Sequence, residues 1–313
     1  MRTYISFLFT LILFSSCEKE KVNYPWQEIN IPSDYDLTDI HFINNTEGFI
    51  SSGETWEHGE ILNTTDGGIS WSNTVLSDFI IKGLDSDRDG TIQSCGHVGY
   101  YSKNFPYSNH TLPTYHQYDD LAVKPDGSQT VLIAGQAFNY SHITLLDENV
   151  QVISVDSFDR DMEVITYIDD NTIMACGSGL VIRSEDNGNT WNPLSLTGEF
   201  FKGISFPTET TGYMCGFGGS ILKSTDGGQN WDYLRNGDKL LVSDKRFTAL
   251  DFEDENHGYV VGLNGLCWRT IDGGNSWKII KGLKDYDFTG VHVMQNKAFL
   301  IAFDGKLIEI IHS

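Results

Sequence analysis

Residues 224–231 read Ser224-Thr225-Asp226-Gly227-Gly228-Gln229-Asn230-Trp231, and closely related octads begin at Thr64, Ser184 and Thr270. All four copies share an aspartate, a glycine two residues later and a final tryptophan: Asp66, Gly68, Trp71; Asp186, Gly188, Trp191; Asp226, Gly228, Trp231; and Asp272, Gly274, Trp277. The second and third aspartates lie 40 residues apart, and three such steps separate the first from the second. Repetition at this period predicts a repeat architecture.

Two eroded copies fill the long gap, at residues 99–104 and 143–149. Each unit opens on an alternation of apolar and polar residues, the period of a half-buried strand, as in Lys202-Gly203-Ile204-Ser205-Phe206. A turn, a strand ending near glycine, a short second turn, a third strand, the octad and a fourth strand follow. Units begin near residues 37, 80, 118, 162, 201, 247 and 288.

Four short strands in about 40 residues make one propeller blade. The last unit ends without a fourth strand, whereas residues 26–31 precede the first unit and resemble the strands that follow each octad. We therefore predict an all-β fold: a seven-bladed β-propeller of four-stranded antiparallel blades over residues 26–313. Residues 26–31 are expected to close the ring by completing the last blade, which removes an exposed edge.

The octads are expected to be structural. Each aspartate is expected to accept backbone N–H groups one or two residues onward, the glycines to permit a tight turn, and the tryptophans to pack between strands. The octad matches the Asp-box, or bacterial neuraminidase repeat, and the unit around Gly212–Gly228 resembles the photosystem II stability/assembly factor family. The resemblance covers residues 26–313. It implies the architecture but not the function, because Asp-box propellers include sialidases, other glycosidases, sorting receptors and assembly factors.

The N-terminus has the pattern of an exported lipoprotein. An apolar run from Tyr4 to Phe14 follows Arg2 and is shorter than the roughly 20 residues that span a bilayer. Residues 13–17, Leu13-Phe14-Ser15-Ser16-Cys17, resemble a bacterial lipobox with Phe14 where leucine is usual. We predict a signal peptide over residues 1–16, lipidation at Cys17, a tether over residues 17–25 and a location in the cell envelope, on its periplasmic face or at the cell surface.

The formal net charge of −22 argues against nucleic acid as a partner and against direct membrane contact beyond the lipid anchor. Four cysteines remain after the lipobox: Cys95, Cys176, Cys215 and Cys267. Three share one place in the repeat, which Val261 fills in another unit, so we interpret them as buried thiols, with a disulfide as the alternative.

A conventional sialidase clamps its substrate's carboxylate with three arginines. Here Arg88, Arg183 and Arg269 fall in segments expected on the face opposite the links between blades, and no Arg-Ile-Pro segment occurs. No catalytic residue is assigned. The leading interpretation is protein recognition or complex assembly without catalysis, and the alternative is carbohydrate binding or glycoside hydrolysis.

Aromatic residues concentrate in the links and second turns, which are expected to share one face. The candidate binding residues are Trp56, His58, Tyr115, Tyr118, Phe138, Tyr140 and Arg246. Phe201, Phe247 and Phe288, which open first strands, are expected to pack at the central channel instead. The basic link from Arg235 to Arg246 fits either contact with an acidic partner or a solvated flap, and both interpretations stay open.

One acidic turn resembles the start of a calcium loop. Asp85, Asp87 and Asp89 alternate before Gly90, but Gly96 stands where the bidentate glutamate should be. No cofactor is expected, with calcium here as the alternative to a plain acidic turn.

Overall fold

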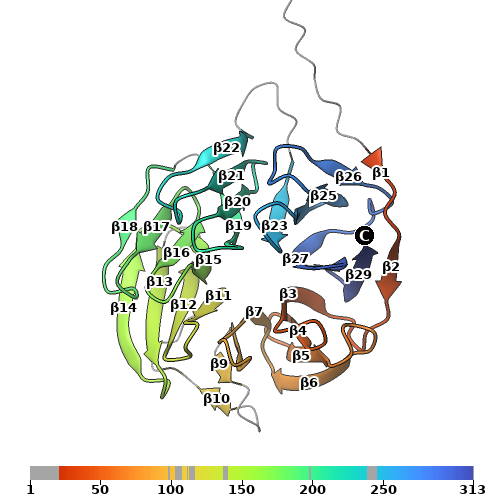
Figure 1. Cartoon of the computed structure of the whole chain (residues 1–313). Helices are drawn as coiled ribbons and strands as arrows, with labels where there is room; N and C mark the ends of the chain where they lie inside the picture. Colours follow the sequence, from red (N-terminus) through yellow and green to blue (C-terminus); the bar gives the residue numbers. More distant parts are fainter. Residues whose placement is uncertain are drawn as a thin grey trace, which may run out of the picture.

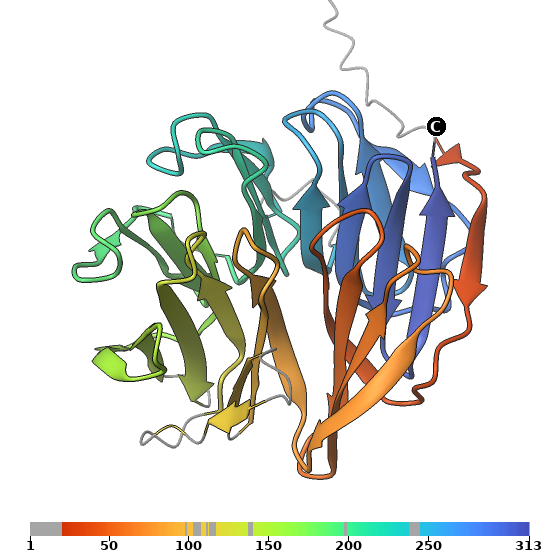
Figure 2. The ribbon, with the colours of Figure 1, turned by 60° about the horizontal axis from the view of Figure 1, so that its bottom comes forward.

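The computed structural model describes residues 21–97, 99–102, 108–110, 112, 117–136, 140–196, 199–237 and 245–312. The strands of these residues form seven sheets arranged in a ring (Figure 1). The first strand of each sheet lies nearest the centre and contacts the inner strands of both neighbours, including β27 with β3, so the ring is closed. Figure 2 shows the strands running between the two faces of the ring.

The sheets are numbered as blades in chain order. Blade 1 holds β3 (Asp36–Phe42), β4 (Gly48–Glu54), β5 (His58–Thr64) and β6 (Ser72–Ser77). Blade 2 holds β7 (Ile81–Ser86), β8 (Ile92–Gly96), β9 (Gly99–Ser102) and β10 (Ser108–His110). Blade 3 holds β11 (Asp120–Val123), β12 (Gln129–Gln136), β13 (Tyr140–Asp147) and β14 (Val152–Phe158).

Blade 4 holds β15 (Met162–Tyr167), β16 (Ile173–Gly177), β17 (Val181–Ser184) and β18 (Asn192–Pro193). Blade 5 holds β19 (Phe201–Ser205), β20 (Gly212–Gly216), β21 (Ile221–Ser224) and β22 (Asp232–Arg235). Blade 6 holds β23 (Phe247–Phe252), β24 (Gly258–Gly262), β25 (Leu266–Thr270) and β26 (Lys278–Ile280). Blade 7 holds β27 (Phe288–Met294), β28 (Lys297–Ala302) and β29 (Lys306–Ile311).

The N-terminal segment adds strands to the last two blades. β2 (Trp26–Ile29) lies antiparallel to β29 as the outer strand of blade 7. β1 (Lys21–Val22) lies parallel to β26 and gives blade 6 a fifth strand. The prediction that every blade has four antiparallel strands is therefore wrong for blade 6. Residues 21 and 22 of the expected tether are part of the sheet, because the edge of β26 offers unpaired backbone groups to an added strand.

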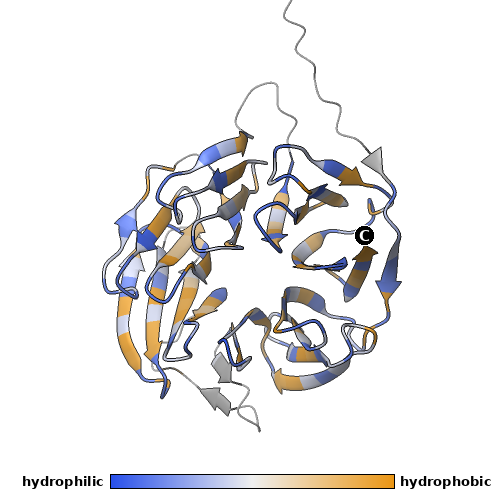
Figure 3. Cartoon of the chain, viewed as in Figure 1, coloured by the Kyte–Doolittle hydropathy of each residue, from blue (hydrophilic) through white to orange (hydrophobic). Residues whose placement is uncertain are grey.

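The core lies between the blades, where apolar residues of successive sheets interdigitate; Figure 3 shows them as orange bands alternating with hydrophilic positions along the strands. All four cysteines of the described residues are buried free thiols, as the repeat context predicted for Cys95, Cys176 and Cys215. Burial raises their pKa above its ordinary value. Among the described residues, no helix has the length and hydrophobicity to cross a bilayer.

The Asp-box geometry differs from the expected one. Asp226 Oδ1 accepts the backbone N–H of Asn230, four residues onward rather than one or two, at 2.9 Å. Ser224 Oγ donates to the same carboxylate and accepts the N–H of Gly228, also at 2.9 Å. The loop is tied back to the first turn of its blade by the bond from Gly227 N to Thr210 O.

These bonds stabilise the ionised carboxylate. In the first Asp-box, the hydroxyl and amide of Ser70 lower the pKa of Asp66 to about 2. The tryptophans pack as expected: Trp231 lies edge-on to Phe206 at 5.9 Å between ring centroids and donates its indole N–H to Gly228 O. The four Asp-boxes thus close the turns between third and fourth strands.

Candidate binding face

Links between blades and second turns lie on one face of the ring, here called the link face. Hydrogen bonds join the two kinds of segment: Phe217 N donates to Phe200 O, and Leu263 N donates to Arg246 O. The Asp-boxes and first turns lie at the other end of the strands, on the Asp-box face. Loops of one face are held together in this way, so the link face is a prearranged surface.

A cavity of about 500 Å³ opens at the centre of the link face and is here called the central cavity. One part of its wall is charged: Lys82, Asp119, Glu163 and Lys202 come from successive blades, 2 to 5. Another part is apolar and comes from second turns of blades 5 to 7: Phe217, Leu263 and Phe303. Phe303 is 44% exposed. The cavity therefore offers both ion pairs and an apolar wall to one ligand.

β-Bulges place three of the four charged side chains of the cavity wall. The register of β7 with β8 shifts between Ile81 and Gly83, which leaves Lys82 as the extra residue, and equivalent shifts isolate Glu163 in β15 and Lys202 in β19. An extra residue in a bulge leaves the strand ladder and re-aims its side chain. Thr38, Thr248 and Thr289 occupy the same place in blades 1, 6 and 7.

The threonines and the charged residues behave differently. Thr38 Oγ1 donates to Ile81 O at 2.6 Å and Thr289 Oγ1 to Leu37 O at 2.6 Å, so these hydroxyls join neighbouring blades. Lys82 pairs with Asp119, and Lys202 pairs with Glu163 while its ammonium lies 4.0 Å from the centroid of the Phe200 ring. Both ion pairs lie in the cavity wall, where a polar group of a ligand can replace one member of a pair.

Half-buried aspartates of the inner strands bridge neighbouring blades just beyond this ring. Asp39 accepts Leu84 N at 2.8 Å, Asp85 accepts Val123 N at 2.8 Å, and Asp120 accepts Ile165 N at 2.9 Å. Burial raises the pKa of Asp39 to about 6 and that of Asp85 to about 7, although the N–H donors lower it. Their geometry makes them structural clips between blades.

Two histidines line the channel nearer the Asp-box face. His41 Nε2 lies 2.9 Å from Ser86 Oγ, and His292 Nδ1 lies 3.8 Å from Asp251 Oδ2. Burial lowers the pKa of His292 to about 3, so it is neutral at physiological pH. Its ring stacks on Phe42, which makes it part of the packing between blades 7 and 1.

Six of the seven predicted binding residues fall into three groups. Trp56 and Tyr140 are 52% and 59% exposed on the link face, and the Arg246 guanidinium lies 5.5 Å from the Phe217 ring centroid at the cavity's edge. His58 is half-buried, stacked on Tyr35 and 3.3 Å from Glu60. Tyr115 and Phe138 lie outside the described residues, as does Cys17.

Tyr118 was predicted as a binding residue, and that prediction is wrong. It is 1% exposed and packs with Cys95 and Leu121 in the core between blades. Phe201, Phe247 and Phe288 are fully buried as expected, but in the core clusters between blades, and of the three only Phe288 also lines the central cavity. Sequence could not separate these aromatics, because each precedes or opens an inner strand and only the register decides which way its ring points.

The aspartates of the acidic turn make separate contacts. Asp85 points its carboxylate to Val123 N of the next blade, whereas Asp87 Oδ1 accepts Thr91 N within the turn. The described residues hold no group of three or more His, Cys, Asp or Glu side chains placed to bind a metal ion. β7 ends at Ser86, so Asp85 belongs to the strand, whereas Asp89 is exposed in the turn that follows it.

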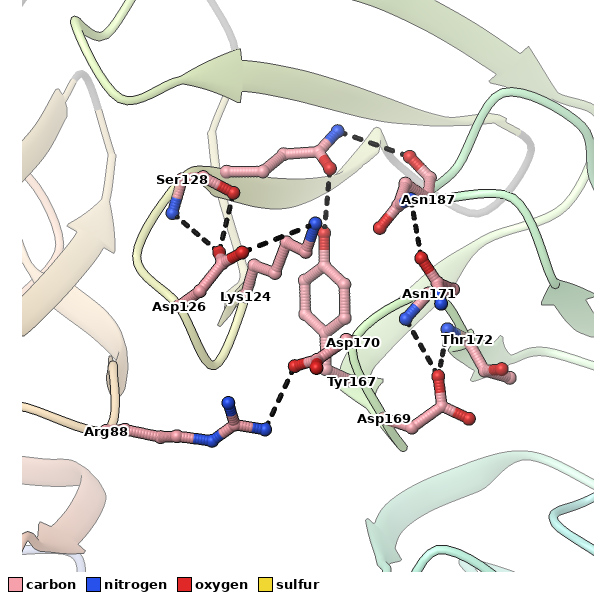
Figure 4. Close-up of polar contacts among 11 residues, drawn as sticks. Arg88, Lys124, Asp126, Ser128, Tyr167, Asp169, Asp170, Asn171, Thr172 and Asn187 are labelled. Atoms are coloured by element: carbon pink, nitrogen blue, oxygen red, sulfur yellow. Dashed lines mark hydrogen bonds and ion pairs between the residues drawn. The ribbon is translucent and has the colours of Figure 1, made fainter.

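Two arginines, Arg88 and Arg183, form their contacts on the Asp-box face. Arg88 pairs with Asp170 at 3.0 Å within a network that joins the first turns of blades 2 to 4 (Figure 4). The network continues from Tyr167 to Gln129 and from Gln129 to the Asn187 carbonyl. Arg183 donates to Gly227 O of the next blade's Asp-box. Neither arginine lines the central cavity, and both lie on the face on which the sequence placed them.

The basic link from Arg235 to Arg246 is described at its two ends only. Arg235 donates to Gly219 O and lies over the Trp268 ring, so it faces the propeller. Gly237 N donates to Ser220 Oγ at 3.0 Å. Arg246 is exposed, and residues 238–244 lie outside the described ranges.

Comparisons with known proteins agree with this architecture. The family model described as photosynthesis system II assembly factor YCF48 matches residues 194–282. No curated protein matches the chain in sequence. A solved structure of YCF48 bound to a D1 peptide is 16% identical with a TM-score of 0.72, covering 94% of this chain and 100% of that one. YCF48 from Cyanidioschyzon merolae is 13% identical with a TM-score of 0.68, covering 91% and 98%.

An enzyme shares the fold as well. A catalytically inactive virginiamycin B lyase from Staphylococcus aureus, solved with quinupristin, is 13% identical with a TM-score of 0.74, covering 93% of this chain and 100% of that one. At these identities the likeness shows the fold alone. The chain is thus a β-propeller of the bacterial neuraminidase repeat type that is similar to YCF48 in sequence over residues 194–282 and in fold over most of its length.

Proposed function

We propose that this protein is a non-catalytic recognition or assembly module that binds a segment of a partner protein through its link face. The observation that supports this most is the central cavity, whose wall combines an apolar part with two ion pairs. Anchors of protein interfaces fill pockets of this kind, surrounded by polar contacts that fix orientation.

The YCF48 structure with a D1 peptide supports the proposal, because that propeller has the same fold and is bound to a peptide. The lyase with quinupristin supports the alternative that this fold holds a small ligand and acts on it. The alternative for this chain is carbohydrate binding or hydrolysis at the same face. The net charge of −22 disfavours nucleic acid in either case.

Affinity capture of the full chain from detergent-solubilised membranes, with stoichiometry by mass spectrometry, tests the proposal. We expect one protein at close to one copy per propeller. Capture of no protein above background, together with glycosidase activity or binding on a glycan array, would establish the alternative.

We further propose that lipid at Cys17 anchors the propeller in the cell envelope. This rests on the lipobox-like segment at residues 13–17. The Cys17→Ser variant should move from the membrane fraction to the soluble fraction, because removal of the acylated residue removes the anchor. Lys19→Gln, in the adjacent tether, should stay with the membrane. Equal membrane partition of the Cys17→Ser variant and the parent would show that another element holds the protein there.

A further inference from the structure

The second turn of blade 1 presents a tryptophan in a backbone conformation that favours glycine. Glu57 N donates to Glu54 O at 3.2 Å, which closes a four-residue turn over Glu54-Thr55-Trp56-Glu57. Trp56 has φ 67°, and it occupies the third position of the turn. A positive φ there is the requirement of type II turns, which normally place Gly or Asn at this position.

The other blades follow the normal rule. The second turns of blades 4 to 7 have a glycine at positive φ, namely Gly179, Gly219, Gly265 and Gly305. Blades 6 and 7 also have Asn264 and Asp304 at φ 58°, and these short polar residues are the non-glycine types that tolerate this conformation. Blade 1 alone among these five turns uses a bulky aromatic residue there. Strain at such a position persists where the side chain has a role that glycine cannot perform, so the outlier points to the indole itself.

The indole is held firmly but remains half exposed. Phe79 lies edge-on to it at 5.7 Å between ring centroids, and His97 of the next blade lies tilted at 5.6 Å. His97 is 6% exposed and forms a fixed support. Trp56 is 52% exposed, so a rigid aromatic surface faces solvent on the link face.

Charge decides which ligand this surface suits. Glu54 and Glu57 are both exposed and flank Trp56 in the turn, on a chain of net charge −22. The electron-rich face of an indole attracts a cation, and nearby carboxylates add to that attraction. We infer that the turn Glu54–Glu57 binds a lysine or arginine side chain of the partner protein, at the rim of the link face.

This inference rests on the proposed function and adds the chemistry of the partner: its bound segment has a basic residue beside the part that enters the central cavity. A neutral sugar stacked on Trp56 is the competing occupant. The two exposed glutamates of the same turn favour the cation, because the charge of a basic side chain adds attraction that a neutral ring lacks.

The test uses the full chain and two synthetic probes, acetyl-tetra-arginine amide and its isosteric tetra-citrulline counterpart, which lacks charge. Binding is measured by titration calorimetry at physiological salt. The Trp56→Gly variant leaves the net charge unchanged and suits the backbone at φ 67°, so it should fold. We expect its dissociation constant for tetra-arginine to rise about fivefold, and that of Glu54→Gln/Glu57→Gln to rise as well. Ile69→Ala, at an exposed apolar residue of the Asp-box face, should bind like the parent.

Equal binding of tetra-arginine by the Trp56→Gly variant and the parent would overturn the inference, since the acidic protein would then attract the probe without this site. Equal affinity for the citrulline probe, or oligosaccharide binding that depends on Trp56, would also overturn it. The proposed function fails separately, if no partner is captured while the tetra-arginine effect persists. The inference fails alone if a captured partner depends on Phe303 but not on Trp56.

Discussion

Replacement of Phe299 by alanine should lower the free energy of unfolding by about 3–5 kcal/mol, the range for truncation of a buried phenylalanine. The Phe299 ring is fully buried between the last and first blades. It stacks parallel to Phe42 at 5.1 Å between centroids and lies edge-on to Trp71 at 6.5 Å. Its loss leaves a cavity at the junction that closes the ring. Denaturant titration followed by tryptophan fluorescence measures the change.

Phe303→Ala is the matched control, because Phe303 lies four residues further along blade 7 with its ring half exposed at the central cavity. We expect its free energy of unfolding to stay within about 0.5 kcal/mol of the parent. If the two variants are equally destabilised, or neither is, the packing described for the blade 7 to blade 1 junction is wrong.

Phe303→Asp should weaken partner binding at least about 30-fold while the fold stays intact, since a central interface anchor contributes about 2 kcal/mol or more. The substitution removes an apolar wall of the central cavity. It also adds a carboxylate to a cavity that already contains Asp119 and Glu163. The dissociation constant for the captured partner, by surface plasmon resonance, gives the result.

Val75→Asp provides the comparison on a surface away from the cavity. Val75 is 59% exposed on β6, the outer strand of blade 1. The Val75→Asp substitution adds the same charge at the outer edge of the propeller. It should leave the affinity for the partner within about twofold of the parent, because charges at the edge of an interface contribute little. Equal loss of affinity in both variants would mean that added charge alone, and not the cavity, explains the effect.

The sequence predicted the blade pattern because its signals are local. Strand alternation, Gly-rich turns and the Asp-box octads each lie within a few residues of the structure they form. The same local logic placed Trp56, Tyr140 and Arg246 on the link face. Cys95, Cys176 and Cys215 share a place in the repeat with Val261, and all four are buried.

What the sequence did not predict depends on register and on distant segments. Lys82, Glu163 and Lys202 line the central cavity because a bulge re-aims each of them, and a bulge has no fixed sequence signature. Their shared place, directly after the residue that opens each inner strand, is the signal that could have identified them. β1 pairs with β26 across most of the chain length, so nothing near Lys21 predicts a fifth strand in blade 6.

The Asp-box bonds were misplaced for a related reason. The aspartate was expected to act as in a short Asx turn, with its acceptors filled from one or two residues onward. The Gly-Gly pair instead extends the loop, as the positive φ of Gly227 and Gly228 shows, and brings the N–H of Asn230 to Asp226. The anchoring bond to Thr210 O lies in another turn, which the octad itself does not include.

Photo-crosslinking from the central cavity distinguishes partner recognition through the link face from recognition elsewhere on the propeller. A benzoylphenylalanine residue at position 303 faces the cavity, and one at position 271 is exposed on the Asp-box face, where Ile271 follows β25. If the partner binds at the link face, illumination in intact cells should yield one defined protein adduct from position 303 and none of the same mass from position 271. An adduct from position 271 alone, or no protein adduct from position 303, would contradict partner recognition through the link face.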